Sequence, residues 1–173
     1  AISKVCVELD DQIVDDNINN RERNYFGINL YVLGYDNNKN FSPINDAVRF
    51  NLLNYLKQYR IMTDSVNIKD AHIINIGIDF EIIVDETYNS NEVLLKCIDT
   101  LKNYFDNEKM GIGKPIFKNT VLKEISLVEG VLSVTNLEFF NLYKTSDGYS
   151  GNVYDIEGAT KRNIIYTSLD QSI

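Results

Sequence analysis

The stretch that decides the fold is Ile74-Asn75-Ile76-Gly77-Ile78-Asp79-Phe80-Glu81-Ile82-Ile83-Val84. Its even positions are apolar, and its odd positions are small or polar, with Ile83 as the exception. A period of two over this length predicts a half-buried antiparallel strand, because a slip of one residue would turn the whole apolar row to water. The sequence therefore predicts a sheet with one buried face.

The segment that follows this strand predicts a helix, a loop, a shorter helix and another strand. Apolar residues recur on one face at 92–106, and Tyr88-Asn89-Ser90-Asn91 supplies the residues that cap such a helix. Gly111-Ile112-Gly113-Lys114-Pro115 then breaks the chain. We expect a short helix near 120–129 that ends at Gly130, and a strand from 131 to about 139.

The segment that precedes the 74–84 strand is expected to begin with a strand of its own. Residues 28–33 favour a strand, and Asp36-Asn37-Asn38-Lys39-Asn40 is a turn of short polar side chains. Ser42-Pro43 has the form of a helix N-cap followed by proline at the first helical position, which predicts a helix over 44–59. A short strand is expected at 66–70.

These elements predict an α+β fold, with an antiparallel sheet and two or three helices packed on one face. The order of strands and helices is close to a ferredoxin-like arrangement in the central part of the chain. We expect three regions: a connector from an upstream domain at 1–27, an α+β core at 28–142, and a C-terminal loop and strand extension at 143–173 that ends with a strand at 163–167.

The composition excludes several classes of protein. With 173 residues and 19.9 kDa, the chain is about the size of one domain, and its 44 % hydrophobic content is that of a globular protein. A net charge of −8 argues against binding to the nucleic-acid backbone, and no apolar run approaches the ~20 residues that cross a membrane. Of the two cysteines, Cys97 lies on the apolar face of a predicted helix, so we expect a buried free thiol.

Candidate catalytic and binding groups are sparse. His72 is the only histidine, and no cysteine stands at metal-ligand spacing from it, so the sequence predicts neither a metal site nor a catalytic pair. Residues 111–114 lack the glycine spacing of a phosphate loop. The 36–40 turn lacks the glycine and glutamate of a calcium loop. We expect no enzymatic activity and no cofactor; the open alternative is a small ligand-binding α+β module.

Several stretches carry a family resemblance in colinear order. They are Leu30 to Asp36, Tyr59 to Ala71, Tyr88 to Leu95, Val128 to Val131, Tyr154 to Thr160, and the ending Ile164 to Ile173. From residue 28 onward the chain resembles the baseplate wedge protein of T-even-type contractile-tailed phages, the gene product six type. More loosely, its central part is similar to baseplate J-like proteins. Thr167 and Gln171 stand where the family usually has prolines.

The resemblance implies a structural protein, corresponding to the C-terminal part of a longer wedge subunit. Such a subunit would assemble as a homodimer or ring and contact other baseplate wedge proteins, but neither nucleic acid nor membrane. Its location would be the baseplate of the virion tail, after assembly in the host cytoplasm. Exposed strand-forming pieces near a chain end suit pairing with another sheet, and tyrosine suits interfaces. The candidate interface residues are Tyr154, Ile164, Ile165, Tyr166 and Leu169.

Overall fold

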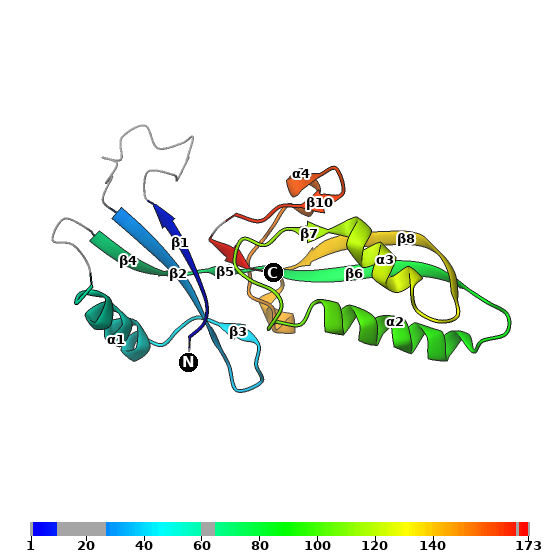
Figure 1. Cartoon of the computed structure of the whole chain (residues 1–173), viewed down its shortest axis with the longest axis horizontal. Helices are drawn as coiled ribbons and strands as arrows, with labels where there is room; N and C mark the ends of the chain where they lie inside the picture. The colour runs from blue at the N-terminus through cyan, green and yellow to red at the C-terminus, as the bar shows by residue number, and fades with distance from the viewer. Residues whose placement is uncertain (1, 10–26, 60–64, 169, 173) are drawn as a thin grey trace.

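Two lobes lie next to each other along the longest axis of the molecule (Figure 1). The computed structural model of the chain describes residues 2–9, 27–59, 65–168 and 170–172. The N-terminal lobe contains the first four strands and helix α1. The C-terminal lobe contains the long antiparallel pair of strands β6 and β8, with helices α2 and α3 between them in the chain (Figure 1).

The N-terminal lobe is a four-stranded sheet centred on strand β2. Strand β1 (Ile2–Leu9) pairs antiparallel with β2 (Gly27–Tyr35), and β3 (Phe41–Ser42) pairs antiparallel with the end of β2. Helix α1 (Asp46–Leu56) crosses back to β4 (Ser65–Asp70), which runs parallel to β2. The buried residues of its core are Tyr31, Leu33 and Ala71, and Cys6, Phe41, Ile73 and Ile112 pack against them.

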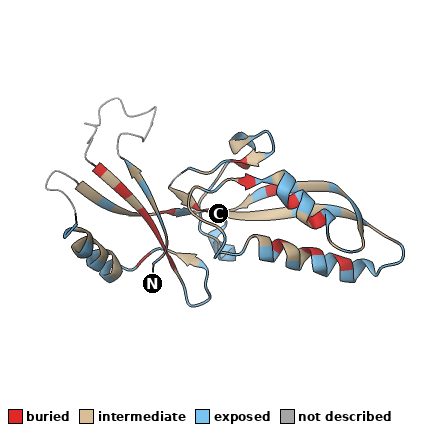
Figure 2. Cartoon of the chain, in the orientation of Figure 1, coloured by how far each residue is buried: buried red, intermediate tan, exposed pale blue. Residues whose placement is uncertain are grey.

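The C-terminal lobe is built on the strand that the alternating pattern predicts. Strand β6 (Asn75–Val84) pairs antiparallel with β8 (Val131–Leu142) along its whole length. Its even-numbered side chains meet α2 (Ser90–Tyr104) and α3 (Lys118–Ser126), so one face of the two-stranded β6–β8 sheet is covered (Figure 2). The buried residues of this core are Val93, Cys97, Leu101, Ile116, Val121, Ile125, Phe139, Ile156 and Ile165.

The C-terminal segment adds small strands to both lobes. Strand β10 (Ile164–Ile165) lies between β7 (Ile116–Phe117) and β9 (Thr160–Lys161), next to the short helix α4 (Ile156–Ala159). A 3₁₀ turn (Thr145–Asp147) follows β8. Strand β11 (Gln171–Ser172) pairs in parallel with β5 (His72–Ile73), the short strand that connects the lobes. The segment therefore contributes to the core and to the joint between the lobes.

A second contact between the lobes comes from the loop after α2. The Lys4 Nζ donates to the carbonyl oxygen of Glu108 at 2.7 Å. The side-chain amide of Asn107 donates to the carbonyl oxygen of Lys39 at 3.1 Å, and Lys39 also forms an exposed ion pair with Glu108. The loop is thus fastened to the N-terminal lobe at the start of β1 and at the β2–β3 turn, which lie at the same end of the sheet.

The α+β class, with antiparallel sheets and helices, is confirmed. The finer arrangement differs from the single sheet that we expected, because α1 lies against the N-terminal sheet and α2 and α3 cover the separate β6–β8 sheet. Strand β1 lies inside the segment expected to be a connector; Val5, Val7 and Leu9 alternate there with Lys4, Cys6 and Glu8. The division into three regions stays a prediction.

One predicted helix start is wrong. Helix α1 begins at Asp46, and the side chain of Asn45, not that of Ser42, caps it by accepting the N–H of Ala47 at 2.6 Å. Ser42 instead belongs to β3, where it pairs with Gly34. Asparagine and serine are about equally good N-caps. Because Ser42 is held in β3, the helix starts after Asn45.

Candidate functional site

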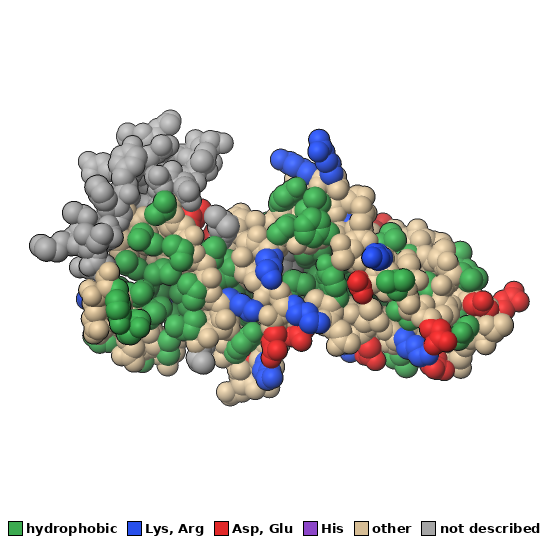
Figure 3. Space-filling view, viewed as in Figure 1, with side chains coloured by type: hydrophobic (Ala, Val, Ile, Leu, Met, Phe, Trp, Pro, Cys, Tyr) green, Lys and Arg blue, Asp and Glu red, His purple; other side chains and the backbone are tan. Residues whose placement is uncertain are grey.

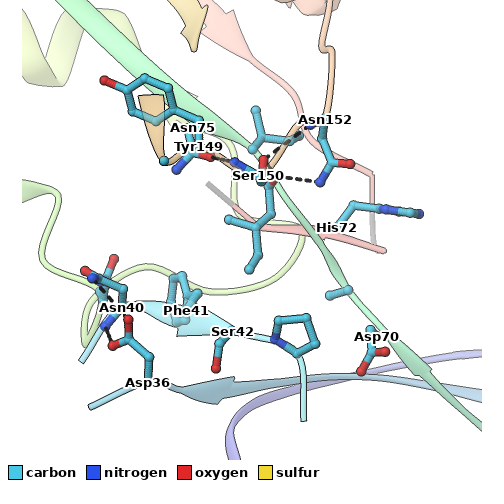
Figure 4. Close-up of a pocket in the computed structure, with 16 residues that line it drawn as sticks. Asp36, Asn40, Phe41, Ser42, Asp70, His72, Asn75, Tyr149, Ser150 and Asn152 are labelled. Atoms are coloured by element: carbon cyan, nitrogen blue, oxygen red, sulfur yellow. Dashed lines mark hydrogen bonds between the residues drawn. The ribbon is translucent and has the colours of Figure 1, made fainter. Parts of the chain in front are cut away.

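One candidate site is a cavity of about 680 Å³ at the joint between the lobes. It is bounded by the β2–β3 turn, by the connecting strand β5 and its neighbours, and by the loop after β8 (Figure 4). The lining residues are Asp36, Asn40, Phe41, Ser42, Pro43, Asp70, Ala71, His72, Ile73, Ile74, Asn75, Asn107, Gly148, Tyr149, Ser150 and Asn152.

Most polar groups of this cavity bond to the protein itself. The Ser150 hydroxyl and the Asn152 side-chain amide both donate to the carbonyl oxygen of Ile73, at 2.7 and 2.8 Å. The Ser150 N–H donates to the Asn75 side-chain oxygen at 2.9 Å (Figure 4). On the opposite wall, one Asp36 carboxylate oxygen accepts backbone N–H groups within its own turn. These bonds hold the loop after β8 to the connecting strand, so the polar groups of the lining have a structural role.

An ion pair at the edge of the cavity is about one-third exposed. The Arg49 guanidinium donates to Asp70 with a distance of 2.6 Å between Nη2 and Oδ2. The other Asp70 oxygen, Oδ1, is buried and has no hydrogen-bond partner within the described part of the chain. Because Arg49 already balances its charge, Asp70 is a structural anchor between α1 and β4.

His72 stands alone in the described structure. Its side chain is exposed on β5, and its backbone N–H donates to the carbonyl oxygen of Asp170 at 2.8 Å. In Figure 4 its imidazole points away from Asp36 and Asn40. No group of three or more His, Cys, Asp or Glu side chains with metal-binding geometry occurs in residues 2–9, 27–59, 65–168 and 170–172. Among these residues, no hydrogen bond or ion pair joins the His72 imidazole to a second catalytic or ligating group.

The loop that could have held a phosphate uses its amides internally. The Gly113 N–H donates to the carbonyl oxygen of Gln171 at 2.7 Å, and the Lys114 N–H to that of Gly111 at 3.3 Å. The Lys114 ammonium donates to the carbonyl oxygen of Lys109 at 3.0 Å. The loop is therefore a connection that fastens β11, and it does not present converging N–H groups.

The candidate interface residues near the C-terminus divide between core and surface. Ile165 is fully buried and Ile164 half-buried, because β10 has a strand on either side. Tyr166 is 48 % exposed. The Tyr154 hydroxyl donates to the Tyr166 carbonyl oxygen, and burial, with a smaller effect of Asp155, raises the pKa of Tyr154. Leu169 lies outside the described residues, and a partner contact here stays a prediction.

A second apolar surface lies on the N-terminal lobe, partly on the segment that we expected to be a connector. Strand β1 exposes Val5, Val7 and Leu9, and α1 exposes Phe50. Figure 3 shows hydrophobic side chains gathered over this lobe. The alternation from Val5 to Leu9 could have identified the strand, but only the pairing with β2 decides that the apolar side faces outward.

No helix in the described ranges has the length and apolarity that a membrane crossing takes. The two thiols are free: Cys97 is buried and Cys6 is half-buried. Burial raises the pKa of both, which keeps them protonated and poorly nucleophilic.

No family model matches the sequence, and neither does any curated protein with which it was compared. Its fold, however, is similar to that of a chain in the cryo-EM structure of the anti-feeding prophage baseplate, solved with six-fold symmetry. The TM-score is 0.54 at 12 % sequence identity, and the similarity covers 78 % of this chain. The matched region makes up 29 % of the prophage chain.

Proposed function

We propose that this chain is a structural component of a phage tail baseplate wedge, located in the virion tail and assembled in the host cytoplasm. The observation that carries the proposal is the fold similarity over 78 % of the chain to a chain of a contractile-tail baseplate. The colinear sequence resemblance to baseplate wedge proteins of the T-even type supports the same role independently.

The proposed role is assembly by protein contacts, both with copies of the chain in a dimer or ring and with other wedge proteins. Exposed apolar side chains on both lobes support it, among them Val7 and Phe50 on the N-terminal lobe and Tyr166 near the C-terminus. In this role the chain is not an enzyme and uses no cofactor. The internal bonding of Ser150, Asn152 and Asp36 in the cavity at the joint is consistent with that proposal.

The location is tested by immunoelectron microscopy of tail particles from cells that carry the gene. An antibody raised against the purified chain should label the baseplate end of each tail. A control antibody against a sheath protein should label the tail along its length. Particles that remain unlabelled after mild disruption of the baseplate, while the antibody still binds the purified chain, would contradict the proposal.

Self-association is tested by light scattering behind size exclusion, over a wide range of concentrations. A mass twice the 19.9 kDa of the chain would support a homomeric contact retained in this segment. A monomer at every concentration would assign the main contacts to other parts of the subunit or to other wedge proteins.

A small ligand-binding module is the second candidate, and the 680 Å³ cavity at the joint favours it. Crystals soaked with small polar fragments would test this function. Fragments bonded to Ser42 or His72 inside the cavity would support it, whereas fragments bound only elsewhere would contradict it.

A further inference from the structure

Strand β6 has one unpaired edge within the described structure. It pairs with β8 over its full length and with no other strand among the described residues. In a strand with one neighbour, every second residue directs its N–H and C=O groups away from that neighbour. This edge therefore presents a row of hydrogen-bonding groups along a ten-residue strand.

The edge lacks several of the features that usually protect exposed strands from pairing, and its charged side chains are those of Asp79 and Glu81. Lysine, proline and bulges commonly block such edges, and β6 contains neither lysine nor proline. The pairing with β8 does have two irregularities, but the additional residues, Leu132 and Thr135, belong to β8. Strand β6 itself keeps its regular alternation and can accept another strand.

An apolar groove runs beside this edge. It has a volume of about 380 Å³ and lies between β6 and helix α2. One wall consists of β6 and the residue before it, and the other of α2 and the loop after it. The lining residues are Ile74, Asn75, Ile76, Ile78, Phe80, Ile98, Leu101, Lys102, Phe105 and Asn107. Helix α2 thus extends under the position that a third strand of the β6–β8 sheet would occupy.

The opposite face of β6 is acidic. Asp79 and Glu81 are exposed there, and Glu138 of β8 lies directly across from Asp79. Like charges in directly opposed positions destabilise a strand pair. A strand added at the free edge would bring every second side chain next to Asp79 and Glu81, where lysine or arginine would relieve this repulsion. Its remaining side chains would point into the apolar groove.

We propose that the free edge of β6 and the groove beside it bind an extended segment of another protein, in which apolar and basic residues alternate. The segment adds a third strand to the β6–β8 sheet: backbone hydrogen bonds hold it, and the two side-chain rows give specificity. A second copy of this chain fits less well. Its exposed strand β1 alternates Val5 and Val7 with Lys4, Cys6 and Glu8, so Glu8 would meet the acidic face.

The inference names a partner surface for the assembly role, and in that sense it rests on the proposed function. The test does not, because it uses the purified chain. A synthetic ten-residue peptide in which valine alternates with lysine is titrated into the protein, and amide hydrogen exchange is followed by NMR. We expect saturable binding, with added protection confined to β6 amides that do not bond to β8. A peptide of the same composition with its valines and lysines in two blocks should bind at least tenfold more weakly.

A charge reversal provides the matched variant. Asp79→Lys with Glu81→Lys changes two exposed side chains and leaves the groove intact. The affinity of this variant for the valine–lysine peptide should be at least tenfold lower than that of the unmodified chain. The variant should instead bind a peptide in which valine alternates with glutamate. Ile98→Asp, on the α2 wall, should weaken both peptides.

Three results would overturn the proposal. The peptide could protect no β6 amides, or the charge reversal could leave the peptide preference unchanged. Self-association of the chain that protects the β6 amides would instead assign the edge to a second copy. Circular dichroism of each variant shows whether lost binding is due to lost folding. If the antibody fails to label tail particles, the baseplate role is contradicted, but the peptide-binding result is unaffected.

Discussion

Gly130 stands where the chain leaves α3 and enters β8, with a φ of +93°. An added Cβ would lie 2.7 Å from Cγ2 of the buried Val93 and 3.0 Å from Cγ of Tyr88. Gly130→Ala therefore adds two costs. A strained backbone conformation costs about 1–3 kcal/mol, and overpacking a core position costs about 1–3 kcal/mol more. We expect the free energy of unfolding to fall by about 2–5 kcal/mol in urea titrations, since reduced freedom of the unfolded chain returns less than about 1 kcal/mol.

Gly148 provides the control for the backbone term. Its φ is +87°, and a Cβ there would meet nothing within 4 Å. Gly148→Ala should therefore show the strain without the steric contact, and be less destabilising than Gly130→Ala by about 1–3 kcal/mol. In a Val93→Ala background, the cost of Gly130→Ala should shrink, because one of the contacting atoms is gone. Equal losses for the two glycine variants would refute the steric argument.

Three further outcomes follow from burial and hydrogen bonding. Ile125→Ala, at a fully buried position, should lower the free energy of unfolding by about 2–5 kcal/mol. Leu127→Ala, at a position 69 % exposed, should change it by less than about 0.5 kcal/mol. Similar values for the two variants would contradict the assignment of Ile125 to the core. The N–H and hydroxyl of Thr87 lower the pKa of Asp85, so its stabilising effect is fully present above the ordinary aspartate pKa and is lost as the pH falls from there through the lowered pKa. Carboxyl NMR titration should show the pKa of Asp85 rising in Thr87→Ala, and an unchanged pKa would argue against the hydroxyl contribution. The Cys97 thiol, fully buried with a raised pKa, should react with a thiol reagent only upon unfolding, and rapid labelling in the folded state would show that α2 opens.

The elements that could be predicted are those whose pattern is local. The alternation in 74–84 defined β6, the apolar period defined α2 with Cys97 buried, and Asn89 caps that helix by accepting the N–H of Asn91 at 3.0 Å. The 36–40 turn forms as expected, with Asp36 accepting the N–H groups of Asn38 and Asn40. In each case the atoms that make the interaction lie within a few residues of one another.

The functional surfaces were harder to predict, because a sequence pattern shows which residues alternate and not which neighbour covers them. Ile165 belongs to a segment that favours a strand, as expected, but strands β7 and β9 on both sides of β10 bury it. The alternating residues of β6 were identified correctly, yet the groove beside them exists only because α2 lies next to an edge that β8 leaves unpaired.

By itself, then, the sequence determined the α+β class and the main helices and strands, since side-chain periodicity and caps act over one or two turns of chain. Only the tertiary structure decided how these elements combine: α1 belongs to one sheet, α2 and α3 to another, and the parallel pairing of β11 with β5 joins the lobes. Such pairings connect residues about a hundred positions apart. Their free energy depends on which backbone edges and apolar faces remain uncovered after the local elements have formed, and no short stretch of sequence contains that information.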